Sequence, residues 1–218
     1  MTISELINKK ELTKDEGFLL CEKIGEEISL KSISERKVDL PFPFALKEPV
    51  ADKLVFFPGS FNPWHMGHLE CIKGCPVGPI VIIPDRNPWK ELVDINPWDE
   101  VLELKEHLLK CKRDDVFIYP GFLALKEQNP TSNWLPQVNV KEKWLLMGDD
   151  LFLGLHRWND IDSILASLKG VYVCPRGANK VELQIQMESL QKIQNIEVLF
   201  LENHEYEEVS SSQLRGEE

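Results

Sequence analysis

The feature that most constrains the fold is an alternation, from Leu54 onward, of short apolar runs with segments long enough for a helix. The runs are rich in β-branched and aromatic residues, and each tends to end in Gly, Pro or Asp. Such continuous apolar runs are typical of strands buried on both faces of a parallel sheet. We therefore expect strands in LVFFPGSF from Leu54, PIVIIP from Pro79, DVFIYPG from Asp115, EKWLLMGDD from Glu142, GVYVCPRG from Gly170 and IEVLFLEN from Ile196.

The intervening segments have the residue spacing of helices. The clearest, PWDEVLELKEHLLKCK from Pro97, has acidic residues in its first turn and basic residues in its last. Its apolar residues recur at helical spacing, at Val101, Leu104, Leu108 and Cys111. Further helices are expected to begin near Met66, Ile161 and Val181. Strands that alternate with helices through right-handed crossovers predict an α/β, Rossmann-like, doubly wound parallel sheet.

Residues 1–52 differ in character from the rest of the chain. One amphipathic helix is expected from about Glu16 to Ile33, followed by LPFPFALKEPV, whose prolines exclude an internal strand. We divide the chain into an N-terminal helical appendage, residues 1–52, and a main domain, residues 53–218. The appendage is interpreted as a remnant of another module, a lid, or an arm that joins copies into a homo-oligomer.

Composition limits the functional classes. A formal net charge of -11 argues against binding to nucleic acid, although a local basic pocket remains compatible with it. No apolar run approaches the roughly 20 residues of a membrane helix, and MTISELINKK lacks the apolar core of a secretory signal. We therefore expect a cytoplasmic protein without a membrane partner. Its five cysteines, irregularly spaced, are expected to be reduced, buried thiols.

One segment carries residues suited to phosphate chemistry. PGSFNPWHMGHLE, from Pro58 to Glu70, leaves the first strand and turns into the helix expected near Met66. In an open parallel sheet the ligand crevice lies at the carboxyl ends of the strands. A helix amino terminus there offers free N–H groups and a favourable dipole to an anion, so phosphate is the expected ligand.

Two histidines in this segment, His65 and His68, are three residues apart and are expected to face the same anion. Gly67 lies between them and has no side chain to obstruct a nucleotide. Transfer of phosphoryl or nucleotidyl groups depends on positioning and charge stabilisation, which imidazole donors supply without a carboxylate base. Taken alone, the pair is equally compatible with helix capping or with half of a zinc site.

The string GSFNPxHxGH resembles the signature of the HxGH nucleotidyltransferase superfamily. That superfamily includes nicotinate and nicotinamide mononucleotide adenylyltransferases, phosphopantetheine adenylyltransferase and several cytidylyltransferases. Many bacterial relatives have Asp where this chain has Asn62, and the GSFNP form resembles the eukaryotic type of nicotinamide mononucleotide adenylyltransferase. The resemblance implies a catalytic role for His65 and His68, mononucleotide binding by Asn62, and ATP binding by Gly59, Ser60, Phe61 and Gly67.

A second segment, VSSSQLR from Val209 to Arg215, resembles the ISSTxIR signature of the same superfamily. The resemblance implies that Ser210, Ser211 and Ser212 bind the triphosphate of ATP and that Arg215 is catalytic. Without the first motif, these residues would be interpreted as a frayed tail. The sequence continues for three residues beyond Arg215. We therefore expect so short a helix to need contacts with a ligand or partner for its stability.

Segments in the middle of the chain resemble one branch of this superfamily in particular. MGDDLFLGLHRWNDI from Met147 resembles the GAD-then-Trp segment of nicotinate mononucleotide adenylyltransferases, and VYVCPRG resembles their next strand. The resemblance implies that Asp150 accepts from ribose hydroxyls and that Trp158 stacks on a pyridine ring, although a tryptophan at this spacing also fits a core position. Lys90 is expected near the phosphates of ATP, or simply in solvent. The other implied mononucleotide-binding residues are Thr131, Trp134 and Arg176.

The expected function is transfer of AMP from ATP to nicotinate or nicotinamide mononucleotide, with release of pyrophosphate, in NAD biosynthesis. Mg²⁺ is expected as a cofactor carried mainly by the ATP phosphates, with no metal site built by the protein. The alternatives are another HxGH enzyme, of the phosphopantetheine adenylyltransferase or cytidylyltransferase type, and a nucleotide sensor without turnover.

Overall fold

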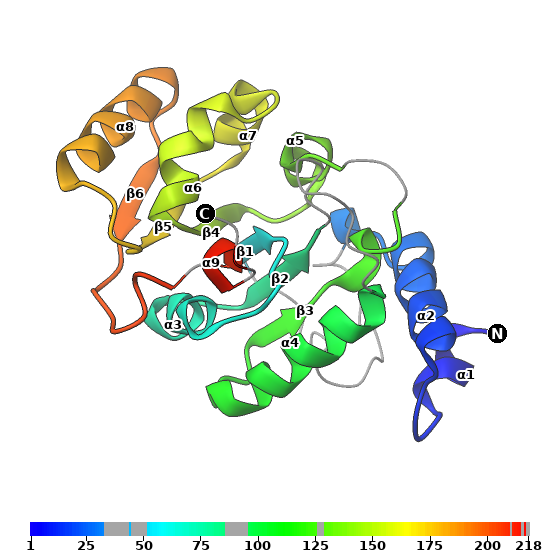
Figure 1. The fold of residues 1–218 in the computed structure, drawn as a ribbon. Coiled ribbons are helices and arrows are strands. Elements are labelled where there is room, and N and C mark those ends of the chain that lie inside the picture. Colours follow the sequence, from blue (N-terminus) through cyan, green and yellow to red (C-terminus); the bar gives the residue numbers. More distant parts are fainter. Residues whose placement is uncertain are drawn as a thin grey trace.

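All six expected strands are present and form one parallel sheet (Figure 1). The computed structural model describes residues 1–32, 44, 52–85, 96–125, 129–209, 211–214 and 216. The strand order is β3-β2-β1-β4-β5-β6. The strands are β1 (Lys53–Gly59), β2 (Ile80–Pro84), β3 (Val116–Ile118), β4 (Glu142–Gly148), β5 (Gly170–Cys174) and β6 (Glu197–Phe200).

This order is that of a doubly wound, Rossmann-like sheet, so the predicted fold class is confirmed. The chain moves outward from β1 to β2 and β3, then returns to the other side of β1 with β4. The loops that follow β1 and β4 therefore leave the sheet in opposite directions and open a crevice at their carboxyl ends. The motif segment GSFNPWHMGH follows β1 and the segment GDD follows β4, so both lie in this region.

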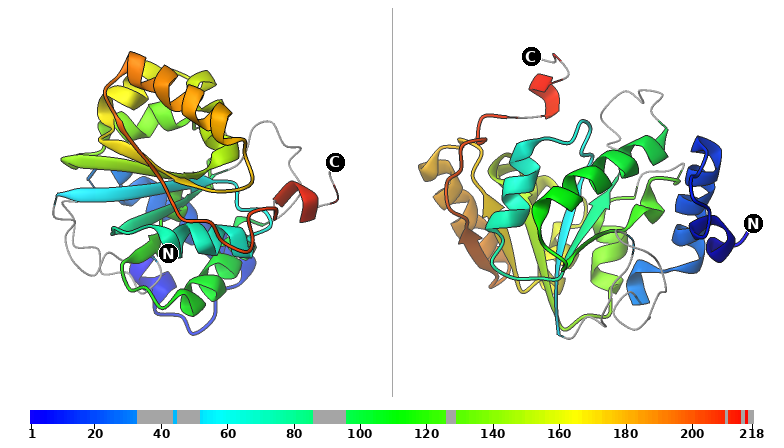
Figure 2. Two further views of the ribbon diagram at one scale, coloured as in Figure 1. Left: turned by 90° about the vertical axis from the view of Figure 1, so that its left-hand side faces the viewer. Right: turned by 90° about the horizontal axis from the view of Figure 1, so that it is seen from below.

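Helices cover both faces of the sheet (Figure 2, left). Along the strands, alternate residues enter opposite cores: Leu54 and Phe56 join one cluster, whereas Val55 and Phe57 join the other. None of the helices in the described ranges has the length and apolar character needed to cross a membrane. One face carries α3 (Met66–Gly74) and α4 (Pro97–Cys111), and the other carries α6 (Asp149–Gly154), α7 (Ile161–Ser167) and α8 (Lys180–Ile193).

Helix α4 has the bounds that the sequence predicts, because both of its ends are encoded locally. The Asn96 side chain accepts a hydrogen bond from the Trp98 N–H at 2.9 Å, and Pro97 occupies the first helical position, where its missing N–H costs nothing. At the other end, Lys112 adopts a left-handed conformation with φ of 55°. The apolar residues at helical spacing, Val101, Leu104, Leu108 and Cys111, are buried, whereas Leu102 and Leu109 are exposed.

The N-terminal segment packs into the same core as the sheet. It forms α1 (Ile3–Ile7), α2 (Lys14–Glu27) and a 3₁₀ turn, η1 (Leu30–Ser32). The expected helix ends earlier than predicted because Ile28 leaves the helical conformation, with φ of -116° and ψ of 84°. Leu20 and Ile24 lie in one buried cluster with Phe56. Most of LPFPFALKEPV lies outside the described residues, and the division at residue 52 stays a prediction.

A close approach of two glycines explains how α2 reaches the sheet. A Cβ on Gly25 would lie only 2.6 Å from the carbonyl oxygen of Gly121, in η2 (Pro120–Phe122), which follows β3. Nearby, the Tyr119 hydroxyl donates to the Ile28 carbonyl at 2.9 Å. Burial raises the pKa of Tyr119 to about 12, so this hydroxyl keeps its proton at neutral pH. The helix is therefore fixed to the β3 end by backbone contact as well as by apolar packing.

The five cysteines are free and buried, as the sequence predicted. Burial raises the pKa of Cys21 to about 12, and burial together with the neighbouring Cys174 raises the pKa of Cys71 well above its usual value. Both thiols therefore behave as apolar core groups at neutral pH.

The packing of α2 predicts that residues 1–32 unfold together with the sheet. Leu20 is 1% exposed, and Leu20→Ala removes buried methyl groups and leaves a cavity, so it should lower the free energy of unfolding by about 2–5 kcal/mol. Urea unfolding followed by tryptophan fluorescence measures the change, because Trp98, Trp134 and Trp144 lie in the cores.

Glu22→Ala, an exposed substitution on the same helix, serves as the matched control and should change stability by less than about 0.5 kcal/mol. If Leu20→Ala left the urea midpoint of the fluorescence transition unchanged and shifted a separate loss of helical signal, the N-terminal helices would fold independently.

Candidate active site

The loop from β1 to α3 positions the first motif. Gly59 ends β1, and a Cβ there would lie 3.0 Å from the ring of Phe61. Phe61 adopts a positive φ of 46° and is buried, with its ring edge-on to Phe57 and to His68. The Phe61 ring therefore packs against the His68 ring and supports it. Ser60 and Asn62, which flank Phe61, are half-buried on the same loop.

The two motif histidines stack on one another. Their ring centroids are 3.7 Å apart, and both side chains are buried, with His65 5% and His68 8% exposed. The His65 backbone N–H donates to Nδ1 of His68 at 3.3 Å. Because a backbone N–H only donates, Nδ1 of His68 is the acceptor, and the neutral ring carries its proton on Nε2. The two histidines thus lie side by side at the start of α3, and the expectation that they face one anion stays a prediction.

Arg176 contacts His65 directly. Its Nη2 lies 2.8 Å from Nε2 of His65, and because a guanidinium only donates, this Nε2 is the acceptor. The His65 proton then resides on Nδ1, which is buried and has no partner among the described residues. Burial, together with the positive charge of Arg176 and against the opposite effect of Asp150, lowers the pKa of His65 to about 4. His65 is therefore neutral at pH 7.

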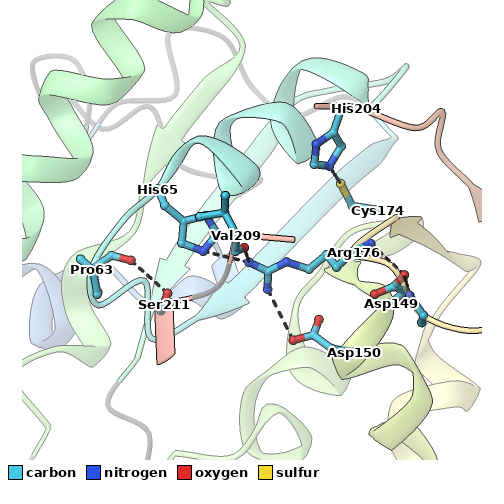
Figure 3. A network of polar contacts seen from close by, with 10 residues as sticks. Pro63, His65, Asp149, Asp150, Cys174, Arg176, His204, Val209 and Ser211 are labelled. Carbon is cyan, nitrogen blue, oxygen red and sulfur yellow. Dashed lines mark hydrogen bonds and ion pairs between the residues drawn. The ribbon is translucent and has the colours of Figure 1, made fainter. Parts of the chain in front are cut away.

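Arg176 is the centre of a polar network that joins four segments of the chain (Figure 3). The same Nη2 donates to the Val209 carbonyl at 3.0 Å, and Nη1 lies 3.4 Å from Oδ2 of Asp150. The Arg176 side chain is 13% exposed, whereas that of Asp150 is 56% exposed. Because this ion pair is long and Asp150 is largely solvated, the pair neutralises the arginine only weakly, and a positive charge remains available to an anion.

The second motif lies against the first. Ser211, which begins α9 (Ser211–Leu214), donates from Oγ to the Pro63 carbonyl at 3.0 Å. A Cβ on Gly67 would lie 3.2 Å from the Tyr206 carbonyl oxygen, so the glycine allows the segment after β6 to cross the start of α3. Two motifs separated by more than 140 residues in the sequence therefore meet at the carboxyl end of β1.

Asp149 was not predicted as a site residue. It is 2% exposed, and its Oδ2 accepts hydrogen bonds from the backbone N–H groups of Arg176 at 2.8 Å and Ala178 at 3.0 Å. Its Oδ1 is buried without a partner among the described residues. The only signal in the sequence is that Asp149 is the first of the two acidic residues in MGDD, which does not reveal that its side chain turns toward the loop after β5.

A cavity of about 350 Å³ lies beside Asp149. It separates the loop after β5 and the start of α8 from the segment after β6. Its walls are mainly apolar side chains with a few polar groups. Its lining includes Asp149, Val173, Gly177, Leu183 and Phe200.

The residues predicted to hold a pyridine ring lie together but apart from the histidines. Thr131 begins α5 (Thr131–Trp134), and Trp158 follows a 3₁₀ turn, η4 (Leu155–Arg157). The two segments meet where Asn159 donates to the Ser132 hydroxyl at 3.2 Å. Trp134 is buried against Phe56 and Phe122, and Trp158 is half-buried against the same core. Their contact with a pyridine ring stays a prediction.

Some predicted residues cannot be placed. Lys90, Ser210 and Arg215 lie outside the described residues, and Ser212 lies in α9 without a described side chain. Within the described ranges, no group of three His, Cys, Asp or Glu side chains is arranged to hold a metal ion.

Comparison with known proteins agrees with this geometry. Residues 56–217 match the family model described as cytidylyltransferase-like. A protein of Leptospira interrogans is 30% identical over 159 residues, covering 67% of this chain and 76% of its own. One of Flavobacterium johnsoniae is 25% identical over 161 residues, covering 69% and 81%. Each is named a probable nicotinate-nucleotide adenylyltransferase. From its fold, its paired motifs and the family match, the chain belongs to the cytidylyltransferase-like family of nucleotidyltransferases.

Proposed function

We propose that this protein transfers AMP from ATP to nicotinate or nicotinamide mononucleotide and releases pyrophosphate, a step of NAD biosynthesis. The observation that carries the proposal is the meeting of His65, His68, Arg176 and the Ser211 segment at the carboxyl end of β1. The names of the relatives from Leptospira interrogans and Flavobacterium johnsoniae support the pyridine acceptor, and favour its nicotinate form.

The reaction requires stabilisation of charge on phosphate oxygens. A phosphate oxygen of the mononucleotide forms a bond to the α-phosphorus of ATP, and the bond from that phosphorus to the pyrophosphate oxygen breaks. Negative charge builds up on the oxygens around the α-phosphorus, and Arg176 offers a permanent positive charge beside it. The N–H groups at the start of α3 add donors with a favourable dipole.

The two histidines act as neutral groups with different roles. The low pKa of His65 keeps its ring uncharged at pH 7, with a proton on Nδ1, and Nε2 of His68 carries the other proton. Neither ring needs to take a proton from the substrate, because a mononucleotide phosphate is already an anionic nucleophile. The contribution of His68 is therefore a hydrogen bond from Nε2 that strengthens as charge develops, whereas His65 accepts from Arg176 and orients its guanidinium.

Mg²⁺ fits the proposal as an ion held mainly by the nucleotide. The described residues include no cluster of three ligands, and Mg²⁺ typically takes one or two carboxylates, several waters and substrate phosphates. Asp150, half-exposed beside Arg176, is the side chain that would contact this ion or its water. When bound, the ion would neutralise charge on the ATP phosphates.

A cytidylyl donor is the second candidate, because the matched family carries the description cytidylyltransferase-like. Pyrophosphate release separates the candidates when ATP or CTP is combined with nicotinate mononucleotide, nicotinamide mononucleotide or phosphopantetheine. We expect release with ATP and a pyridine mononucleotide. Release only with CTP, or only with phosphopantetheine, would replace the proposed substrates. Tight nucleotide binding without release from any pair would favour a nucleotide sensor.

His68→Ala should lower kcat by about two orders of magnitude or more, since removal of one transition-state donor typically has that effect. Steady-state kinetics measures the loss. The control is His156→Ala, an exposed histidine to which the sequence assigns no role, which should leave kcat unchanged. Circular dichroism verifies that both variants fold. Near-normal turnover in a folded His68→Ala protein would remove His68 from the mechanism.

The neutral state of His65 predicts a pH dependence of stability. The unfolded histidine binds a proton near pH 6.5, whereas the folded one, with a pKa of about 4, binds it only at lower pH. The unfolded state therefore gains the proton first on acidification. The contribution of His65 is full above about pH 6.5 and is lost as the pH falls toward 4, by about 3 kcal/mol in total.

The variant His65→Gln has no titrating ring and isolates this effect from the carboxylates. Urea unfolding at pH 7, 5.5 and 4.5 should show a larger loss for the wild type than for the variant. Equal losses at every pH would mean that His65 is already protonated or exposed in the folded state.

A further inference from the structure

Four aromatic rings pack around the imidazole of His68, the proposed donor to the transferring phosphate. The ring centroid of His68 lies 3.7 Å from that of His65, 5.0 Å from Trp64, 5.1 Å from Phe61 and 6.2 Å from Phe57. All four rings belong to β1 or to the loop that leads from β1 into α3. His68 is 8% exposed, so packing rather than solvent surrounds its ring.

The orientation of the His68 ring is not fixed by its own covalent geometry. The torsion that turns an imidazole about its Cβ–Cγ bond has broad minima, so the ring plane depends on what packs against it. The hydrogen bond from the His65 backbone N–H to Nδ1 is long, at 3.3 Å, and therefore weak. This bond selects which ring nitrogen faces the backbone, but it leaves the ring plane to the neighbouring side chains.

Trp64 is the neighbour best placed to fix that plane. It is 3% exposed, and its ring is inclined by 40° to the imidazole. Phe57 and Phe61, in contrast, meet the imidazole at 64° and 80°, which are edge contacts. A wide indole that lies obliquely along a smaller ring limits its rotation more than an edge contact does, because a close-packed interior leaves little free space.

Trp64 is itself supported from α4. The ring of His107, on α4, lies 5.9 Å from the indole at an interplanar angle of 33°. Burial and the charge of Lys110 lower the pKa of His107, against the opposite effects of Glu103 and Glu106. Its ring is therefore uncharged at pH 7 and packs as a flat group. The series of rings thus connects the active site to a helix whose ends are set by local sequence.

Trp64 contributes its ring rather than its N–H group. Its Nε1 is buried and has no hydrogen-bond partner among the described residues. A buried donor without a partner destabilises a protein, so no hydrogen bond accounts for an indole at this position. A phenyl ring at the same place is therefore expected to replace it.

We propose that Trp64 is a positioning residue of the active site: its ring holds the His68 imidazole in the plane in which the Nε2–H group meets the phosphate oxygens. Because Trp64 is buried, it acts through His68 and does not touch the substrate. The proposal rests on the proposed nucleotidyl transfer. It adds that the orientation of the donor is set before the substrate binds.

The kinetic test replaces the ring by a flexible chain. Trp64→Met fills much of the same space without a flat face, and it should lower kcat by about tenfold, since misplacement of a catalytic group is costly. The KM for ATP should change little, because the donor on His68 acts mainly in the transition state. Trp64→Phe retains a ring and should keep most of the wild-type kcat. Unchanged kcat in folded Trp64→Met, or an equal loss in Trp64→Phe, would overturn the proposal.

A double variant separates positioning from a general loosening of the core. If Trp64 acts through His68, Trp64→Met should cause no further loss of kcat in a protein that already carries His68→Ala. The same fold loss in both backgrounds would overturn the proposal.

The matched control is Trp144→Met. Trp144 is also 3% exposed, lies in the same core cluster and has a buried Nε1 without a partner among the described residues. It pairs with Val55, however, near the amino end of β1 and away from the motif loop. Trp144→Met should lower the urea midpoint and leave kcat unchanged. A loss of kcat equal to that of Trp64→Met would assign both losses to packing and would overturn the proposal.

Nuclear magnetic resonance of the histidine ring nitrogens reports the orientation without any reaction. The signals of His68 are those that disappear in His68→Ala. In the wild type and in Trp64→Phe they should show one tautomer, with the proton on Nε2. In Trp64→Met they should show exchange between tautomers. A single tautomer with the proton on Nε2 in all three proteins would overturn the proposal.

Contacts between the ring protons of Trp64 and His68 can be measured in the wild type with Mg²⁺ and a non-hydrolysable ATP analogue. They should persist when the nucleotide binds, and their loss would overturn the proposal even where Trp64→Met fails to fold. Failure of the proposed function is a different result. Pyrophosphate release from no pair of substrates would refute AMP transfer, while the ring contacts and the tautomers would still decide the role of Trp64.

Discussion

The site depends on one side chain, Arg176, whose guanidinium joins segments that are distant in the sequence. Its Nη2 contacts both His65 and the Val209 carbonyl, and its backbone N–H is fixed by Asp149. The loop after β1, the end of β4, the loop after β5 and the segment after β6 are therefore held in one arrangement. This partly buried positive charge, with one long ion pair, lies against a carbonyl and a neutral imidazole, and it remains ready to meet an anion.

The parallel sheet explains why these segments meet. Every strand points the same way, so every connecting loop at the carboxyl edge starts from the same side of the molecule. The order in which strands are added to the sheet reverses between β1 and β4, so the helices that follow these two strands cover opposite faces and leave a gap at that edge. Strand register places Gly59 opposite Pro84, and Gly148 opposite Cys174, so the loops begin at similar heights. The histidines, Asp149 and Arg176 thus converge without any long excursion of the chain.

Local patterns were sufficient for the strands, for α4 and for the position of the first motif. Continuous apolar runs identify buried strands, and the cap at Asn96 marks where α4 begins. The sequence did not reveal that α2 ends at Glu27, that its apolar residues join the core of the sheet, or that Asp149 binds the loop after β5. Each of these depends on partners far away in the chain, such as Gly121 for α2 and Ala178 for Asp149. Adjacent Asp149 and Asp150 look alike in sequence, yet one is 2% exposed and the other lies half in solvent.

The charge of the protein makes these short-range contacts decisive. With a formal net charge of -11, the chain repels anionic nucleotides at long range, although salt screens that field beyond about 8–10 Å. Attraction must therefore arise within the site, from Arg176, from the N–H groups at the start of α3 and from the Nε2–H of His68. Mg²⁺ on the phosphates would reduce the charge that has to approach. Affinity for a nucleotide then depends on how well the four segments are held together. Arg176 joins them, and the carboxylate of Asp149 fixes the Arg176 backbone.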